Sequence, residues 1–280
     1  MRGSDRLEAG LSLLDDGRWD QAVAALEHAH AEAPGTVSAY WLAQARFQRV
    51  RHATYASAWE GLAEWREVAR QLAAVRALAG TRVEVDTTLL ARESVIARAS
   101  IVETLLVIGV GTEPGASHRL VHLESLLESL PAPEPAPYGL LRGYVLAVAP
   151  ELPPDSLLHK MRATWWGVLV DPGALRAEHI FAHSAPADPA RQSGGEGRER
   201  APADVVRIYP VRVSWGNSPR SGRRVLCLDH SDVPADERCL DLEELVQVSD
   251  GAYLGRGLRR EGEAENTRWR DIAYYVLATL

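Results

Sequence analysis

The sequence contains almost no lysine, since Lys160 is the only one among 31 lysine and arginine residues. Phenylalanine is nearly as scarce, with Phe47 and Phe181 as its two occurrences. Abundant alanine, leucine, glycine and proline accompany this shortage, a composition typical of a GC-rich bacterial genome. The many arginines therefore reflect codon usage, and an arginine does not mark a functional site by its identity alone.

Two cysteines, Cys227 and Cys239, are too few for a disulfide framework, so we expect a reducing compartment. Apolar runs such as residues 105–110 are far shorter than the roughly 20 residues of a membrane-spanning helix. The first residues lack the apolar segment of a secretory signal. A net charge of −7 argues against a general nucleic-acid coat. The sequence predicts a cytoplasmic protein with no membrane partner.

The apolar pattern changes near residue 175. Before this point apolar residues recur every three or four positions, and after it they alternate in β-branched runs. This predicts an α+β protein with a helical domain at 1–175 and a small β-rich domain at 176–280. Residues 184–203 are rich in Ala, Pro, Gly and charge, which predicts a mobile loop.

A first pair of helices is expected within residues 6–34. Gly17 suits the left-handed position that ends a helix, and Pro34 cannot continue one. Further helices are expected at 59–78, 116–130, 138–149 and 154–167. Another is expected to begin at a cap formed by Asp86 or Thr87.

The spacing of small and aromatic residues in the first pair is distinctive. It involves Gly10, Gly17, Trp19, Ala22, Ala29 and Pro34. These positions resemble a tetratricopeptide repeat, and Tyr40 and Phe47 extend the resemblance to about residue 50. The tight turn of a second repeat is replaced by a longer loop at 51–57. The resemblance implies a helical array with a protein-docking face at Trp41, Gln48 and Arg49.

Strands are expected at 178–184, 205–216, 223–230, 237–241 and 245–249. Residues 217–222 form a hairpin loop, and Pro210 favours an edge strand or a bulge. The last residues, 268–280, fit a helix or a strand.

The order of these strands resembles a WYL domain, a small Sm-like β-barrel that senses ligands or nucleic acid. Leu226 and Arg238 agree with its motifs, whereas Arg224 and Val225 replace the Trp and Tyr of its name and Glu244 replaces a late arginine. The resemblance implies a small antiparallel β-barrel-like domain at 178–250. No helix-turn-helix accompanies it.

Arginines accumulate on the β-rich part, and Arg207, Arg212 and Arg238 are the candidate ligand-binding residues. They would bind a small anionic ligand or nucleic acid. Residues 201–250 hold six arginines and nine acidic residues, a local balance of −3, which favours mixed-charge surfaces.

Cys227, Asp229, His230 and Cys239 fall on neighbouring expected strands and would make a Cys–His nucleophilic site or part of a zinc site. Their spacing matches no known zinc pattern. Two histidine pairs, His118 with His122 and His179 with His183, have no evident third ligand. Glycines 109, 111 and 115 fit a turn better than a phosphate loop. We therefore predict no catalytic residue, metal or cofactor.

Together these patterns predict a non-enzymatic bacterial adaptor or sensor. Its helices would dock a partner protein, and its β module would sense a small anionic ligand. The alternatives are a WYL-like regulator that binds nucleic acid or nucleotide through arginines, and an enzyme that uses Cys227 and His230. The oligomeric state is left open.

Overall fold

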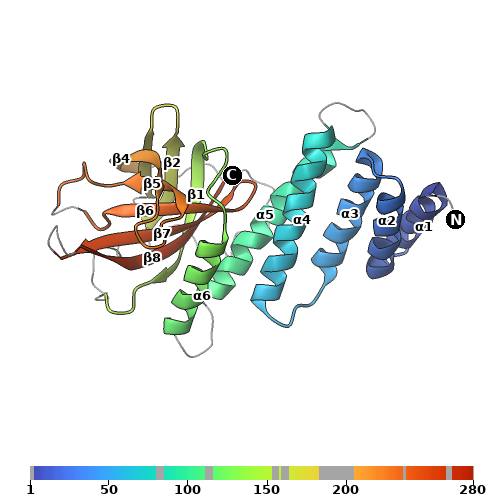
Figure 1. Cartoon of the computed structure of the whole chain (residues 1–280), viewed down its shortest axis with the longest axis horizontal. Coiled ribbons are helices and arrows are strands. Elements are labelled where there is room, and N and C mark those ends of the chain that lie inside the picture. The colour runs from blue at the N-terminus through green and yellow to red at the C-terminus, as the bar shows by residue number, and fades with distance from the viewer. Residues whose placement is uncertain are drawn as a thin grey trace. The chain divides into compact units, whose positions relative to one another are not determined.

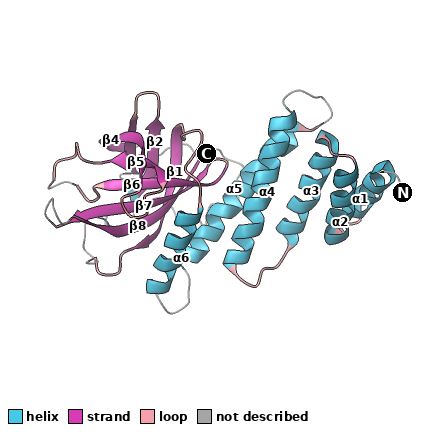
Figure 2. Ribbon diagram, in the orientation of Figure 1, coloured by secondary structure: helices cyan, strands magenta, loops and turns pink. Residues whose placement is uncertain are grey.

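The computed structural model describes most of the chain. It covers residues 3–79, 85–110, 116–152, 158, 164–182, 205–235, 238–262 and 267–279, so the expected loop at 184–203 lies outside the described residues. Helices come first and strands follow (Figures 1 and 2), which confirms the α+β class. The chain separates into two compact units, residues 1–105 and 106–280.

The first unit consists of helices that follow one another along the chain. They are α1 (Gly3–Asp15), α2 (Trp19–Glu32), α3 (Thr36–His52), α4 (Ala58–Ala79) and α5 (Thr87–Val110), whose last residues belong to the second unit. Helices α1 to α4 pack each on the next. Gly10 allows α1 to lie close to α2, because a Cβ there would lie 2.6 Å from Cγ of Leu26. Gly17 follows α1 with a φ of 72°, a conformation that glycine adopts without strain. Oδ1 of Asp86 accepts a hydrogen bond from the backbone N–H of Leu89 at 2.9 Å, which confirms one of the two expected caps.

A buried carboxyl group lies within this helical unit. Glu93 of α5 is 3% exposed and accepts a hydrogen bond from the side-chain amide of Gln44 in α3. Burial raises the pKa of Glu93 to about 7, and the charge of Asp86 adds to the rise. The folded state therefore holds a proton that the unfolded chain releases at lower pH. The stability from this group is complete below about pH 4.5 and is lost as the pH rises through 7.

We expect Glu93→Gln to increase the free energy of unfolding at pH 8 by on the order of 2 kcal/mol, because glutamine stays neutral when buried. At pH 4.5 the variant and the wild type should be equally stable. Urea denaturation at both pH values measures the difference. Glu103→Gln, at an exposed position of the same helix, is the control. An equal gain at both pH values would contradict the assignment to ionisation.

The second unit is a closed barrel of eight antiparallel strands, in which each strand pairs with the next and β8 pairs with β1. The strands are β1 (Gly139–Val148), β2 (Trp165–Asp171), β3 (Arg176–Ala182), β4 (Val205–Asn217), β5 (Arg224–Asp229), β6 (Leu242–Ser249), β7 (Ala252–Glu261) and β8 (Arg268–Thr279). Helix α6 (Ala116–Ser129) precedes them and contacts β7. Closure leaves this sheet without a free edge.

Side chains alternate between the barrel interior and its outside. The interior is filled mainly by Leu141, Val168, Val170, Ala177, Val211, Val213, Leu226, Leu228, Leu245, Tyr253, Tyr275 and Leu277. Outward positions are also buried where a helix covers them. Leu146 is 1% exposed, and a Cβ on Gly109 of α5 would lie 2.8 Å from the Cβ of Leu146.

Several expectations are corrected by these strands. The helix expected at 138–149 is wrong because β1 occupies Gly139–Val148. Most of the helix expected at 154–167 lies outside the described residues, and its end belongs to β2. Both strands are apolar on two faces, so neither shows the alternation of a half-exposed strand. The domain boundary expected near residue 175 consequently falls in the turn between β2 and β3.

Other strand predictions have mixed outcomes. Residues 238–241 lack strand structure, so the strand expected at 237–241 is wrong over its described part. The open question at 268–280 is settled over residues 268–279, which form β8. Pro210 lies at a register shift between β3 and β4, which confirms the expected bulge.

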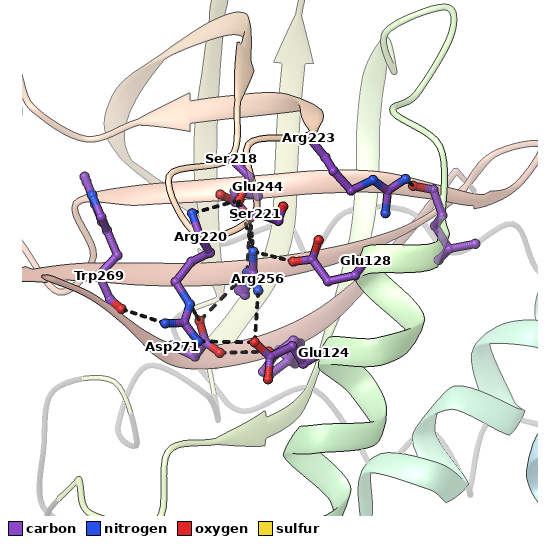
Figure 3. A network of polar contacts seen from close by, with 12 residues as sticks. Glu124, Glu128, Ser218, Arg220, Ser221, Arg223, Glu244, Arg256, Trp269 and Asp271 are labelled. Atoms are coloured by element: carbon purple, nitrogen blue, oxygen red, sulfur yellow. Dashed lines mark hydrogen bonds and ion pairs between the residues drawn. The ribbon is translucent and has the colours of Figure 1, made fainter.

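Arg256 of β7 attaches α6 to the barrel strands (Figure 3). The Arg256 side chain is fully buried and its Nη2 atom lies 2.6 Å from Glu244 of β6 and 3.1 Å from Glu128 of α6. The Oδ1 atom of Asp271 in β8 lies 3.8 Å from the Nε atom of Arg256. Arg220, in the β4–β5 hairpin, joins the network through Glu124 of α6 at 3.2 Å. The buried guanidinium group of Arg256 therefore links α6 to β6 and β8.

Candidate functional site

A cavity of about 70 Å³ is lined by inward-facing side chains of the barrel strands and by residues of the segment between β5 and β6. Most of its wall is apolar or aromatic, including Val145, Trp165, Phe181, Val233, Ala273 and Tyr275. The polar side chains in the wall are His179, His230, Arg238, Cys239 and Glu243. An apolar cavity with a few converging polar groups is the usual form of a small-molecule site.

Two of these polar groups converge on a carboxylate oxygen of a third. His179 comes from the middle of β3, His230 directly follows β5, and Glu243 lies near the start of β6. Oε1 of Glu243 lies 2.8 Å from Nε2 of His179 and 2.6 Å from Nε2 of His230. Glu243 is 1% exposed, so its carboxylate is withdrawn from bulk water. We call His179, His230 and Glu243 the His–His–Glu cluster.

Hydrogen bonding fixes the proton positions in the cluster. The indole N–H of Trp165 donates to Nδ1 of His179 at 3.2 Å. Nδ1 therefore carries a lone pair, and in the neutral ring the proton sits on Nε2, facing Glu243. His230 is held by its backbone N–H, which donates to the carbonyl of Asp241 at 3.1 Å. Its Nε2 also faces the carboxylate, so both imidazoles stabilise the ionised form of Glu243.

The electrostatics of Glu243 reflect a competition. Burial alone would raise its pKa, but the two imidazoles outweigh burial and hold the pKa of Glu243 well below its usual range. Burial, reinforced by the charge of Glu243, raises the pKa of Tyr275 well above its usual value. Tyr275 therefore stays a neutral phenol.

Glycines make room for the aromatic wall. The ring of Tyr275 lies over Gly255, where an added Cβ would be 2.1 Å from Cε2 of the tyrosine. The ring of Trp165 similarly lies over Gly143, where an added Cβ would be 2.6 Å from Cη2 of the tryptophan. The two rings meet edge to face with centroids 5.3 Å apart. The glycines thus allow both large rings to lie beside the His–His–Glu cluster.

The arginines expected to bind a ligand lie in different surroundings. Arg238 lines the cavity and pairs with Asp241 at 3.3 Å. Arg212 is more than half exposed and pairs with Asp229 and Asp232 instead. Arg207 belongs to β4, but its side chain lies outside the described residues. The structure therefore brings one of the three to the cavity.

The expected docking residues belong to α3 of the helical unit. Trp41 is half-buried and packs against the cluster formed by Val23, Leu26 and their neighbours. Gln48 is also half-buried, and Arg49 pairs with Glu64 of α4 at 2.6 Å. These contacts anchor Trp41 and Arg49 to their own unit.

The structure places Cys227 and Cys239 in different surroundings. Cys227 lies between the inward-facing Leu226 and Leu228, so it points out of the barrel, whereas Cys239 lines the cavity. Burial, followed by the charges of Glu244 and Asp229, raises the pKa of Cys227 to about 11. A thiol with a raised pKa is a poor nucleophile, so Cys227 has no sign of activation.

The remaining candidate motifs are only partly described. His183 and glycines 111 and 115 lie outside the described residues, and so does the side chain of His118. Gly109 lies within the last turn of helix α5 and not in the expected turn. Within the described residues, no other group of three potential ligand side chains accompanies the His–His–Glu cluster.

Sequence reasoning missed Glu243 because no motif connects it to the histidines. A signal was nevertheless present in the strand alternation. Glu243 and Leu245 share one face of β6, and Leu245 belongs to the interior core. A carboxylate at an inward position of a barrel strand is costly unless it has a partner or a function.

Comparison of the chain with protein-family models, with curated proteins and with solved structures found no match. The resemblances to a tetratricopeptide repeat and to a WYL domain therefore stay predictions from the sequence. Among the described residues, no helix combines the length and apolar character needed to cross a membrane.

Proposed function

We propose that this protein is a sensor whose barrel binds a small molecule and whose helical unit docks a protein partner. The observation that carries the proposal is the barrel cavity with its aromatic wall and buried His–His–Glu cluster. The apolar wall would hold the body of the ligand, and the cluster would bind its polar end.

The charge of the cavity favours one kind of polar end. Glu243 is buried and ionised, while the guanidinium of Arg238 is already paired with Asp241. A carboxylate on the ligand would be repelled by Glu243, whereas an ammonium group would be attracted to it. The metal-free cavity therefore favours an apolar amine over the small anion expected from the arginines.

Isothermal titration calorimetry with hexylamine and hexanoate tests this preference with two ligands of equal chain length. We expect hexylamine to bind at least about 10-fold more tightly, because it can pair with the buried carboxylate. Glu243→Gln should remove the preference, and Ala273→Phe should abolish binding by filling the cavity. Trp215→Phe, at an exposed position of β4, is the control. Equal binding by the wild type and Ala273→Phe would place the ligand elsewhere.

The helical unit would supply the output of the sensor. Its support is the resemblance of residues 6–50 to a protein-docking repeat. A pull-down from native lysate with and without nuclease tests it, using Gln48→Ala with Arg49→Glu as the docking variant. Trp41 is left intact because it packs in the core of its unit. A partner that survives nuclease and is lost with the variant supports docking. Capture that depends on nucleic acid would favour the alternative regulator.

The arginines of the barrel unit give less support to that alternative. Arg212, Arg220, Arg238 and Arg256 each pair with at least one carboxylate. Paired guanidinium groups have less free charge to offer to phosphates. The sensor is therefore the function that the described residues favour.

A further inference from the structure

We infer that the His–His–Glu cluster is a binding site for one divalent transition-metal ion. Two imidazole nitrogens and one carboxylate oxygen form a ligand set suited to zinc or iron(II). The candidate ligand atoms all lie within 4.8 Å of one another, and all three residues are buried. This inference concerns the metal alone, and its test needs no organic ligand.

Charge supports a cation at this position. The cluster holds a carboxylate with 1% exposure, and the nearby Arg238 is engaged by Asp241. In the metal-free state Nε2 of His230 hydrogen-bonds Oε1 of Glu243, while Nε2 of His179 lies 2.8 Å from the same oxygen without hydrogen-bond geometry. A metal ion would take the place of the protons on these two nitrogens and neutralise the carboxylate more completely.

Access supports an open coordination position. The same three side chains line the barrel cavity, and the rest of the wall is mostly apolar. Three protein ligands beside a cavity leave room for water or a small molecule on the metal, unlike the closed four-ligand sites that are purely structural. The bound ion would also reverse the ligand preference of the cavity and favour small anions.

Trp165 opposes the metal in a specific way. Its indole N–H donates to Nδ1 of His179, which keeps the proton on Nε2. Binding of a metal through Nε2 moves that proton to Nδ1, where it faces the indole N–H. Ligating histidines usually donate their second N–H to an acceptor, so this arrangement costs about one hydrogen bond. Trp165 is thus a positioning residue that sets the affinity of the site.

Equilibrium dialysis of the full, untagged chain against Zn²⁺, with metal measured by mass spectrometry, tests the inference. We expect one tightly bound ion per chain. Glu243→Gln, His179→Ala and His230→Ala should each weaken binding at least about 100-fold, since even outer-shell changes cost 10–100-fold. His28→Ala removes an exposed histidine of the helical unit and should leave binding unchanged. Circular dichroism establishes that each variant is folded.

Two further measurements make the site assignment specific. Trp165→Phe should bind Zn²⁺ about fivefold more tightly, because the opposing indole donor is gone. A Co²⁺ spectrum of the wild type should show nitrogen and oxygen ligation, and it should be unchanged in Cys227→Ser. Absence of binding to the folded wild type would overturn the inference. So would binding that survives in Glu243→Gln or weakens in Trp165→Phe.

Discussion

Replacement of Arg256 by methionine should lower the free energy of unfolding of the barrel unit by about 3–5 kcal/mol. The substitution keeps an unbranched side chain of similar length but leaves the Glu244 carboxylate, which is 0% exposed, without its guanidinium partner at 2.6 Å. Glu128 loses a contact at 3.1 Å from the same nitrogen. The expected destabilisation arises mainly because the buried charge of Glu244 is left without a partner. The attraction lost between the two side chains is the smaller part.

Chemical denaturation of the full chain, followed by near-ultraviolet circular dichroism, measures this effect. Arg212→Met is the matched control, because Arg212 pairs with Asp229 and Asp232 at an exposed position, where we expect a change below about 1 kcal/mol. Adding Glu244→Gln to Arg256→Met should recover a large part of the loss by removing the unpaired charge. A double variant less stable than Arg256→Met would contradict this account.

The same network explains why part of the fold could be predicted and part could not. Helix α6 was expected at 116–130 from its apolar spacing, and the structure confirms it as Ala116–Ser129. Its contact with the barrel depends on Glu124 and Glu128, which pair with Arg256, a residue far from both in sequence. Glutamates at helical spacing predict a solvated helix face, and arginine is rarely fully buried. Local sequence therefore indicates neither the contact of α6 with the barrel nor the burial of Arg256.

The strands show a similar division. Strands β4 and β5 were predicted because the hairpin loop at 217–222 and the alternating residues agree. Strand β1 was mistaken for a helix because its inward face packs in the barrel and its outward face meets α5, leaving an apolar run with no clear period. Strand β7 was missed, and its sequence begins with small and apolar residues followed by arginines.

The candidate site could not be predicted from the sequence, because its residues meet only once β3, β5 and β6 are paired in register. His179 and His230 were noticed, but each was grouped with neighbours in sequence such as His183 and Cys227. In the barrel the relevant neighbour of both is Glu243, which is 64 and 13 positions away. Local spacing finds ligand sets that lie on one helix or loop. It does not find sets assembled across a barrel, where strand order and register decide which side chains meet.

Replacement of Gly255 by alanine should lower the free energy of unfolding by about 3 kcal/mol, the upper end for an overpacked core. The added methyl group would lie 2.1 Å from Cε2 and 2.2 Å from Cζ of Tyr275, so the ring must leave its place beside the cavity. Backbone conformation is not the cause, since the φ of Gly255 is not in the left-handed region. Gly35→Ala is the control, because an added Cβ there meets no atom within 4 Å and we expect a cost below about 1 kcal/mol.

A double-mutant cycle with Tyr275→Leu isolates this clash from other effects of alanine. Leucine lacks the Cε2, Cζ and hydroxyl atoms that crowd position 255, so Gly255→Ala should cost less than about 1 kcal/mol in the Tyr275→Leu background. The expected coupling is therefore about 2 kcal/mol, measured by urea denaturation of the four proteins. Additive effects would mean that the glycine is required for a reason other than the tyrosine ring. Strong coupling would establish that Gly255 is kept without a side chain so that Tyr275 can lie against the wall of the cavity, next to the His–His–Glu cluster.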